Sequence, residues 1–323
     1  MIVHAVVDYS FLYYKYKFQL ESGKMRRLSA PVDWKGTVIE KDISQIYYSI
    51  KEIEGFRRSL ENAGHNVFVS VCFDMPSARK QGVNDTDEAG ADKYKSNRVK
   101  KLTDNDFENI QYVEKLLSDA GYNTYRFNGY EADDIIAHLV TEYKNVFDYT
   151  VIYTPDLDLL VHVCDKVGCM RYKVLHGYQS VDINNVQNYL SEELKCTMPL
   201  NGLTLYKSTV GDKSDCIDGI RKFGPKAFDK LVAVLNEGGI NWEEMNNWMT
   251  VETIIKSMGA CGYFTQEQTN EALNSLSLVR PMTFGGVDEN GNQMPLPVRP
   301  IKHSTRELRE ASYMRCNMKS LIE

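Results

Sequence analysis

The sequence predicts an α/β fold with a mainly parallel central sheet flanked by helices, followed by a smaller helical domain. Over residues 1–156, short apolar segments rich in β-branched residues alternate with segments of helical periodicity. Three of these apolar segments end at or just before an aspartate, namely Asp8, Asp74 and Asp156. After about Met198 the apolar residues recur only at helical spacing. We therefore expect an α/β domain over residues 1–198 and a helical domain over residues 199–323.

The elements of the α/β domain follow in order along the chain. The predicted strands cover residues 2–7, 67–73, 123–127 and 150–154. The predicted helices cover residues 43–60, 107–117 and 131–143. Strands that alternate with helices in this way form parallel sheets, and ligands bind beyond the carboxyl ends of such strands. The aspartates that follow the strands should therefore meet at one edge of the sheet.

The second domain has its helical periodicity in short pieces, over residues 200–209, 225–235, 242–258 and 266–278. Residues 285–300 are rich in Gly, Pro and Asn, which favours an irregular connection. The last segment, from Ser304 onward, is predicted as a helix, and we expect this tail to pack against the helical domain.

The composition excludes several classes of protein. With 43% hydrophobic and 25% charged residues, the chain is neither disordered nor fibrous. No apolar run approaches the ~18 residues of a membrane span, and the first residues lack a signal-peptide pattern. The seven cysteines form no Cys-x-x-Cys pair, which argues against zinc and disulfides and predicts a cytoplasmic protein. The net charge of −6 argues against a nucleic-acid partner unless many of the acids face metal ions.

Acidic residues gather in five short segments. They are Asp8, Asp74, Glu131, Asp133, Asp134, Asp156, Asp158, Asp212 and Asp215. Each segment alone is more often a helix cap or a turn, but together, at strand ends, they favour a shared site. Clustered carboxylates repel one another and need cations, and ligands that are all oxygens suit Mg²⁺ or Mn²⁺. Two such ions about 4 Å apart can cleave a phosphodiester bond.

Three of these segments carry a resemblance. Residues 131–137 read Glu-Ala-Asp-Asp-Ile-Ile-Ala, residues 154–158 read Thr-Pro-Asp-Leu-Asp, and residues 211–215 read Gly-Asp-Lys-Ser-Asp. Over most of the chain to about Leu231, the sequence resembles the flap endonuclease family of structure-specific 5′-nucleases, which includes phage enzymes and the 5′-nuclease domain of bacterial DNA polymerase I. The resemblance implies a PIN-like sheet and a helix-hairpin-helix-type module, the helix-three-turn-helix, that begins near residue 211.

The resemblance also implies a set of metal ligands. The first ion would be held by Asp8, Asp74, Glu131 and Asp133. The second would be held by Asp133, Asp156, Asp158 and Asp212, with Asp134 and Asp215 in support. We expect two Mg²⁺ ions, for which Mn²⁺ can substitute.

The charged stretch at about residues 79–106 resembles the helical arch of this family. Lys95 and Arg98 would then be catalytic residues that neutralise charge on the scissile phosphate, and Tyr94 would stack on a base. The alternative is a solvated charged loop without a role in catalysis.

Residues 219–226 resemble the hairpin that binds the phosphates of duplex DNA, with Lys222, Gly224 and Lys226 as the contacting residues. Two departures stand out: residues 216–218 read Cys-Ile-Asp where the family has Asn-Ile-Pro, and Lys222 replaces the first hairpin glycine. These departures argue against a K⁺ site at the hairpin but leave the DNA-binding role open.

The resulting hypothesis is an Mg²⁺-dependent 5′-3′ exonuclease and flap endonuclease of DNA replication or repair, with RNase H activity as a further candidate. Its partners would be branched or 5′-ended DNA, or RNA–DNA duplexes. We expect a monomer, with a polymerase, a sliding clamp or a single-strand-binding protein as candidate protein partners. The alternatives are a TOPRIM-type enzyme, which also combines a Glu with Asp-x-Asp, and a non-catalytic DNA-binding relative.

Overall fold

A six-stranded sheet forms the centre of the protein. The computed structural model describes residues 1–34, 36–75, 102–174, 176–199, 201–279, 284–287, 293–295 and 299–321. In spatial order the strands are β5 (Asn123–Tyr125), β4 (Asn66–Cys72), β1 (Ile2–Asp8), β6 (Tyr149–Thr154), β7 (Val167–Lys173) and β8 (Gly177–Val181). All neighbouring pairs are parallel except β7 and β8, which are antiparallel. The predicted α/β fold with a mainly parallel sheet is therefore confirmed.

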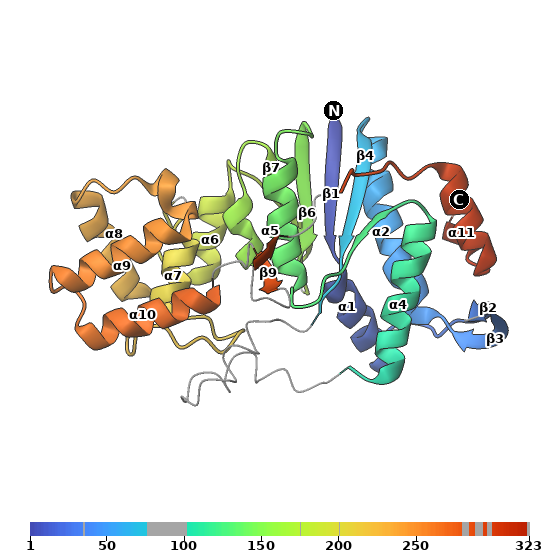
Figure 1. The fold of residues 1–323 in the computed structure, drawn as a ribbon, viewed down its shortest axis with the longest axis horizontal. Helices are drawn as coiled ribbons and strands as arrows, with labels where there is room; N and C mark the ends of the chain where they lie inside the picture. Colours follow the sequence, from blue (N-terminus) through green and yellow to red (C-terminus); the bar gives the residue numbers. More distant parts are fainter. Residues whose placement is uncertain are drawn as a thin grey trace.

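Helices cover both faces of the sheet (Figure 1). On one face lie α1 (Tyr9–Glu21), α2 (Ser44–Asn62) and α4 (Asp104–Asp119), and on the other lies α5 (Ala132–Tyr143). Side chains of β1 alternate between the two faces of the sheet. Ala5 and Val7 pack with the buried residues of α1, α2 and α4, and Val6 packs with those of α5. A strand buried on both faces explains why this segment is almost continuously apolar.

Two elements at the beginning of the chain were not predicted. The residues that α1 buries are Tyr9, Leu12, Tyr13, Tyr16 and Leu20. Their spacing is helical, but tyrosines and lysines alternate between them, so the pattern becomes clear only when tyrosine is counted as apolar. The second element is an antiparallel hairpin of β2 (Ser29–Trp34) and β3 (Thr37–Asp42).

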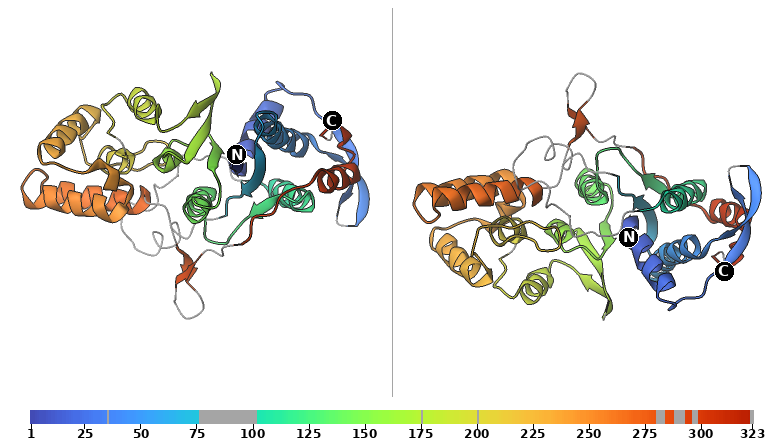
Figure 2. Two further views of the ribbon diagram at one scale, coloured as in Figure 1. Left: turned by 90° about the horizontal axis from the view of Figure 1, so that it is seen from above. Right: turned by 90° about the horizontal axis from the view of Figure 1, so that it is seen from below.

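The helical elements lie together at one end of the molecule (Figures 1 and 2). They are α6 (Val186–Leu194), α7 (Leu203–Val210), α8 (Pro225–Glu237), the short 3₁₀ helix η3 (Trp242–Asn246), α9 (Trp248–Ala260) and α10 (Gln266–Val279). The single helix predicted over 242–258 is divided at Asn247, because the side chain of Asn247 accepts the N–H of Met249 at 2.9 Å and caps α9.

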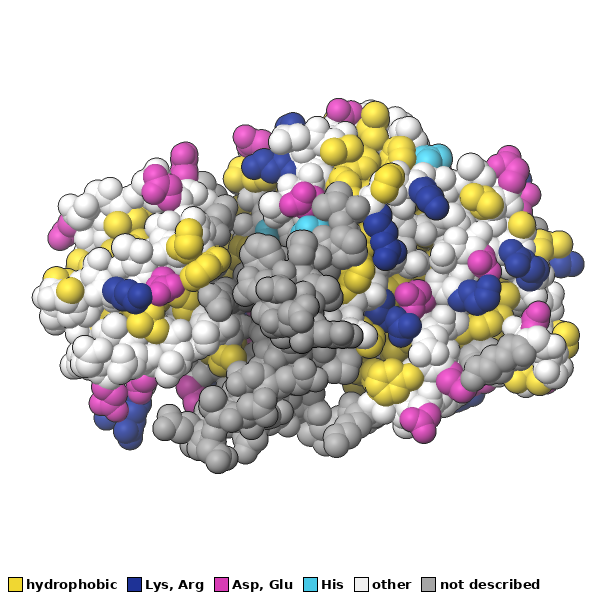
Figure 3. All heavy atoms as spheres, viewed as in Figure 1, with side chains coloured by type: hydrophobic (Ala, Val, Ile, Leu, Met, Phe, Trp, Pro, Cys, Tyr) yellow, Lys and Arg dark blue, Asp and Glu magenta, His cyan; other side chains and the backbone are white. Residues whose placement is uncertain are grey.

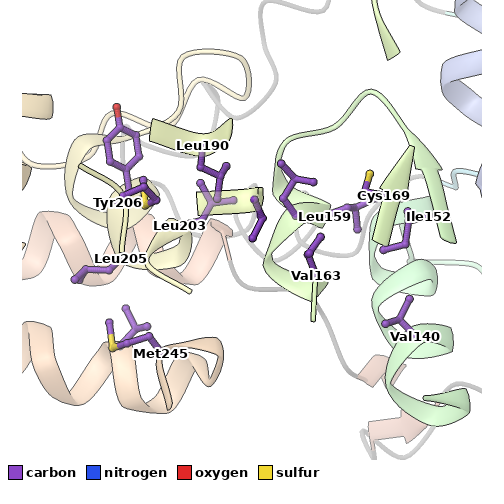
Figure 4. Close-up of a cluster of buried hydrophobic side chains, with 14 of the residues drawn as sticks. Val140, Ile152, Leu159, Val163, Cys169, Leu190, Leu203, Leu205, Tyr206 and Met245 are labelled. Carbon is purple, nitrogen blue, oxygen red and sulfur yellow. The ribbon is translucent and has the colours of Figure 1, made fainter. Parts of the chain in front are cut away.

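One hydrophobic cluster runs from the sheet into these helices (Figure 4). It joins Val140 of α5 and Ile152 of β6 to Leu203 of α7 through Leu159 of η2 (Asp158–His162). Buried side chains are therefore continuous across residue 198, and the division of the chain into two domains there stays a prediction.

The expected packing of the C-terminal tail against the helical domain is wrong. Helix α11 (Arg306–Arg315) lies at the opposite end of the molecule and packs on α4 (Figure 2). The Tyr313 hydroxyl donates to Glu54 at 2.7 Å, and the Ser312 hydroxyl donates to the Leu116 carbonyl at 2.9 Å. Tyr313 is fully buried with the side chains of the α2–α4 face, because it offers both an apolar ring and a donor for a buried carboxylate.

The connection before this tail contains more regular structure than we predicted. Strands β9 (Phe284–Val287) and β10 (Gln293–Pro295) pair in antiparallel fashion within the segment expected to be irregular. None of the helices in the described part of the chain is long and apolar enough to cross a membrane.

Candidate metal centre

Three of the predicted acids, Asp8, Asp74 and Asp156, lie where the parallel strands β1, β4 and β6 end. Asp8 is the last residue of β1 and caps α1, accepting the N–H of Phe11 at 3.4 Å. The Thr154 hydroxyl, at the end of the neighbouring strand β6, donates to Asp8 at 3.1 Å. Asp74 follows β4 and accepts the N–H of Ala132 at 2.7 Å. These contacts connect the ends of three strands with the beginning of α5.

The electrostatics of this group are those of carboxylates buried close to one another. The pKa of Asp8 is raised to about 7 by burial first, and then by the charges of Asp74 and Asp156. The pKa of the Cys72 thiol is also raised, first by burial and then by Asp8 and Asp133. Asp8, Asp74, Asp133 and Asp156 therefore act on a common region. A cation placed there would favour the ionised carboxylates.

The acidic segment of residues 131–134 forms the beginning of α5. Glu131 caps the helix, and its N–H donates to the Asp134 carboxylate at 3.2 Å. Glu131 and Asp134 are buried and Asp133 is partly exposed. The N-terminus of a helix stabilises negative charge, which is why three acids can occupy one turn.

The Asp-x-Asp segment after β6 makes a tight turn. The N–H of Asp156 donates to the Thr154 hydroxyl at 3.1 Å, and the N–H of Asp158 donates to the Asp156 carboxylate at 2.9 Å. This turn directs Asp158 away from the strand and toward the helical region. One carboxylate oxygen each from Asp158, Asp212 and Asp215 lies within 4.8 Å of the others.

The loop that carries Asp212 and Asp215 is closed by its own backbone. Asp212 and Ile217 exchange two N–H···O=C bonds, both of 2.8 Å. Gly219 has φ +67°, and a Cβ there would lie 2.4 Å from the Gly211 nitrogen. Glycine is therefore required at Gly219, both for its conformation and for the close approach of two backbone segments.

A lysine that the sequence analysis did not identify lies in this second group. Lys207 of α7 forms ion pairs with Asp158 and with Asp212, and its side chain is only 6% exposed. Burial acts to raise the pKa of Asp212, but Lys207 and Ser214 outweigh it, so that the pKa is lowered. The signal available in the sequence was that Lys207 is the one charged residue in the segment 203–210. In the structure every residue from Leu203 to Thr209 is buried.

A small cavity of about 50 Å³ connects the acids of α5 with the second group. Its polar lining consists of Glu131, Asp133, Asp134, Asp158, His162, Thr204, Lys207 and Asp215. A larger cavity, of about 360 Å³ between α4 and α11, contains none of the predicted ligands. The donors around the small cavity are mostly carboxylate oxygens, and this chemistry fits hard divalent cations such as Mg²⁺. The roles of the individual acids as ligands stay predictions.

The hairpin near residue 222 keeps its turn although a glycine is replaced. Lys222 adopts φ +63°, a left-handed conformation that costs a residue with a side chain about 1–2 kcal/mol. Gly224 precedes α8 and Pro225 is the first residue of that helix. Lys222 and Lys226 are both exposed. The predicted arch residues Tyr94, Lys95 and Arg98 lie outside the described residues.

Basic side chains on the face shown in Figure 3 are more frequent near α4 and α11 than over α9 and α10. Two basic residues of α4 and the segment after β5 are paired with acids: Lys115 with Asp119 at 2.9 Å, and Arg126 with Glu114 at 2.9 Å. Surface pairs of this kind leave a mixed charge rather than a strongly basic surface, in agreement with the net charge of −6.

Comparisons with known proteins agree with this architecture. The family model described as "5′-3′ exonuclease, N-terminal resolvase-like domain" matches residues 6–191. DNA polymerase I of Caldicellulosiruptor bescii is 34% identical over 166 residues, which are 51% of this chain and 18% of that protein. The 5′-3′ exonuclease of Aquifex aeolicus is 29% identical over 201 residues, which are 61% of this chain and 62% of that protein. The chain therefore spans less than two thirds of the length of these relatives.

Among solved structures, the T5 D15 protein co-crystallised with metal ions has the same fold, with a TM-score of 0.51 and 15% identity. The similarity covers 86% of this chain and all of the T5 protein. At this identity the likeness concerns the fold alone. Because the family model matches more than half of the residues, this chain belongs to the family of 5′-3′ exonucleases with a resolvase-like N-terminal domain.

Proposed function

We propose that this protein is a structure-specific 5′-nuclease that hydrolyses phosphodiester bonds in DNA with the help of two Mg²⁺ ions. The observation that carries the proposal is the convergence of acids from separate segments. The acids at the ends of β1, β4 and β6 adjoin the beginning of α5, and the cavity there continues to Asp158 and Asp215. Membership in the exonuclease family supports the same reaction.

The residues that would hold the metals follow from this arrangement and from the family motifs. Asp8, Asp74, Glu131 and Asp133 would hold one ion, and Asp133, Asp156, Asp158 and Asp212 the other, with Asp134 and Asp215 in support. When bound, a pair of divalent ions polarises the attacking water and stabilises the leaving oxygen. The T5 protein with the same fold was crystallised with metal ions, which supports a metal site in this chain.

The chain's own contacts would keep these ligands in position. The Thr154 hydroxyl donates to the Asp8 carboxylate and accepts the backbone N–H of Asp156, so it orients one carboxylate and fixes the backbone that carries another. The N–H of Ala132 orients the Asp74 carboxylate. Ligands that are fixed before the metal binds lose little conformational freedom on binding.

DNA would be held at two places. The exposed Lys222 and Lys226, together with the backbone at Gly224, would contact the phosphates of the duplex. Tyr94, Lys95 and Arg98 would act near the scissile phosphate. Because phosphate contacts release counterions, we expect the affinity for DNA to fall steeply with salt concentration.

The proposed substrates are DNA with a free 5′ end or a 5′ flap and, as a further candidate, RNA–DNA duplexes. Several relatives are DNA polymerases I, of which this chain matches only a small part. A polymerase is therefore a reasonable candidate partner, and a cytoplasmic role in replication or repair would follow.

The test is a cleavage assay with 5′-labelled flap, nicked and RNA-primed duplexes, in EDTA, Mg²⁺, Mn²⁺ and Ca²⁺. We expect cleavage only with Mg²⁺ or Mn²⁺, and a loss of at least about 1,000-fold in the double variant Asp156→Asn, Asp158→Asn. Cleavage in EDTA, or full activity of the double variant, would contradict the proposed mechanism. DNA binding without any cleavage would support the non-catalytic alternative, and strand passage would support the TOPRIM alternative.

A further inference from the structure

Lys207 is a buried cation between two acids that are predicted metal ligands. Its ammonium group contacts the Asp158 carboxylate and lies 2.5 Å from the Asp212 carboxylate. A buried lysine without partners is strongly unfavourable, so these two acids are what allows the charge to remain in the interior.

The same carboxylates belong to the group that could hold one metal ion. Asp158, Asp212 and Asp215 offer three oxygens within 4.8 Å of one another. An ammonium group and a divalent ion would therefore use the same oxygens. Lys207 already balances part of the negative charge of Asp158 and Asp212, so these two acids attract an ion less strongly than they would without the lysine.

The acids at the strand ends have no such partner. In the described part of the chain, no Lys or Arg forms an ion pair with Asp8, Asp74 or Asp156. Asp8, Asp74 and Asp156 therefore have no ion-pair partner among the described residues, whereas Asp158 and Asp212 share Lys207.

We propose that Lys207 is a positioning residue that competes with a divalent ion for Asp158 and Asp212, so that this group binds its ion more weakly than the group around Asp8. The inference rests on the proposed two-metal function and adds an order of filling, with the Asp8 side first. Lys207 also holds Asp158, which follows β6, against Asp212, which follows α7, and so joins the sheet edge to the helical region before an ion binds.

The variant Lys207→Met removes the charge and keeps the length of the side chain. In a Mn²⁺ titration followed by electron paramagnetic resonance, we expect two classes of site in the wild type. In Lys207→Met the weaker class should tighten by about tenfold or more, and the tighter class should stay unchanged. Lys207→Arg keeps the charge and should resemble the wild type. Lys230→Met, which removes an exposed lysine of α8, is the matched control and should also leave both classes unchanged.

Thermal unfolding gives an independent measurement. In EDTA, Lys207→Met should melt at a lower temperature than the wild type, because two close carboxylates lose their counter-ion. Mn²⁺ should remove this difference, because the bound ion replaces the lost positive charge. If Lys207→Met is unfolded even with Mn²⁺, Lys207→Gln, which keeps a hydrogen-bond donor, takes its place in both measurements.

A folded variant whose weaker class is unchanged or weakened would overturn the inference. Its failure is distinguishable from failure of the proposed function. If the Mn²⁺ sites respond to Lys207→Met as expected but the protein cleaves no DNA, the inference about Lys207 is supported and the proposed nuclease function is contradicted. If the protein cleaves DNA but Lys207→Met changes neither class of Mn²⁺ site, the nuclease function is supported and the inference is contradicted. A wild type that binds no Mn²⁺ would contradict both.

Discussion

The two groups of acids in this protein differ in how their charge is balanced. Around Asp8, carboxylates face carboxylates, and the pKa of Asp8 is raised to about 7 by burial and by Asp74 and Asp156. Around Asp212, Lys207 is close enough to overcome burial, and the pKa of Asp212 is lowered. The same type of side chain therefore has opposite shifts within one site. The difference shows that the number of acids does not determine how strongly a group attracts a cation; the neighbouring charges do.

The largest expected effect comes from removing the charge of Asp8, which has no ion-pair partner among the described residues. Asp8→Asn should lower cleavage by at least about 1,000-fold, because Asp8 is a predicted ligand at the end of β1. In EDTA the same variant should be more stable than the wild type by on the order of 2 kcal/mol, since it relieves repulsion between buried acids. Single-turnover cleavage and urea unfolding measure the two effects.

Asp165→Asn is the matched control, because it makes the same chemical change at an exposed position. It should alter neither cleavage nor stability. If Asp8→Asn is less stable than the wild type in EDTA, the group around Asp8 is not under electrostatic strain and the comparison fails.

The second prediction concerns only the group around Asp212. Gly219→Ala should destabilise the protein by about 2–4 kcal/mol, because a Cβ would lie 2.4 Å from the Gly211 nitrogen at φ +67°. Distortion of this loop should also remove the weaker class of Mn²⁺ site and spare the tighter one. Urea unfolding and Mn²⁺ titration test these outcomes.

Gly238→Ala serves as its control, since a Cβ at Gly238 would meet only ordinary contacts of 3.4 Å and longer. Loss of both classes of site in a folded Gly219→Ala protein would show that the two groups do not behave separately.

The third prediction is a pH dependence without metal. The folded-state pKa of Asp8 is about 7, above the unfolded value near 4, so protonated Asp8 contributes stability that is complete below about pH 4. This contribution is lost as the pH rises to about 7. In EDTA, the wild type should therefore lose more stability between about pH 5 and about pH 8 than Asp8→Asn does, as measured by urea unfolding. Equal losses in the two proteins would argue against the raised pKa.

The smallest expected effect tests the hydroxyl that connects two strand ends. Thr154→Val removes the donor to Asp8 and the acceptor for the Asp156 N–H at almost constant volume. We expect a loss of about 1 kcal/mol in stability and of about tenfold in cleavage, with Thr154→Ser close to the wild type. A Thr154→Ser protein as impaired as Thr154→Val would assign the effect to the methyl group instead.

Local patterns were sufficient for the parts of the fold that depend on neighbouring residues. The strand that ends at Asp8 and the helix that begins at Glu131 were both predicted, because burial on two faces and helix capping leave clear signals in a short window. Helix α1 was missed for the opposite reason, since Tyr13 and Tyr16 are buried aromatic rings with polar ends. The strands β7 and β8 were also missed, as was α6.

The tail shows where local reasoning fails. Its helix was predicted, but its partner was not, because the Glu54 carboxylate that Tyr313 meets is 259 residues away. The periodicity of α11 indicates that one face is buried, and nothing in it indicates against which surface. The buried carboxylate of Glu54 and the apolar side chains around it form a partner surface that no short window of the sequence reveals.

By itself, the sequence determined the parallel sheet, the positions of the acids at strand ends and the motif that places three acids on the first turn of α5. Only the tertiary structure decided which acids share a cation and which repel. Lys207 reaches Asp158 across a separation of 49 positions in the numbering, and it does so because α7 packs against the turn after β6. The strength of a charge interaction depends on distance and burial in space, and neither quantity is written in the order of the residues.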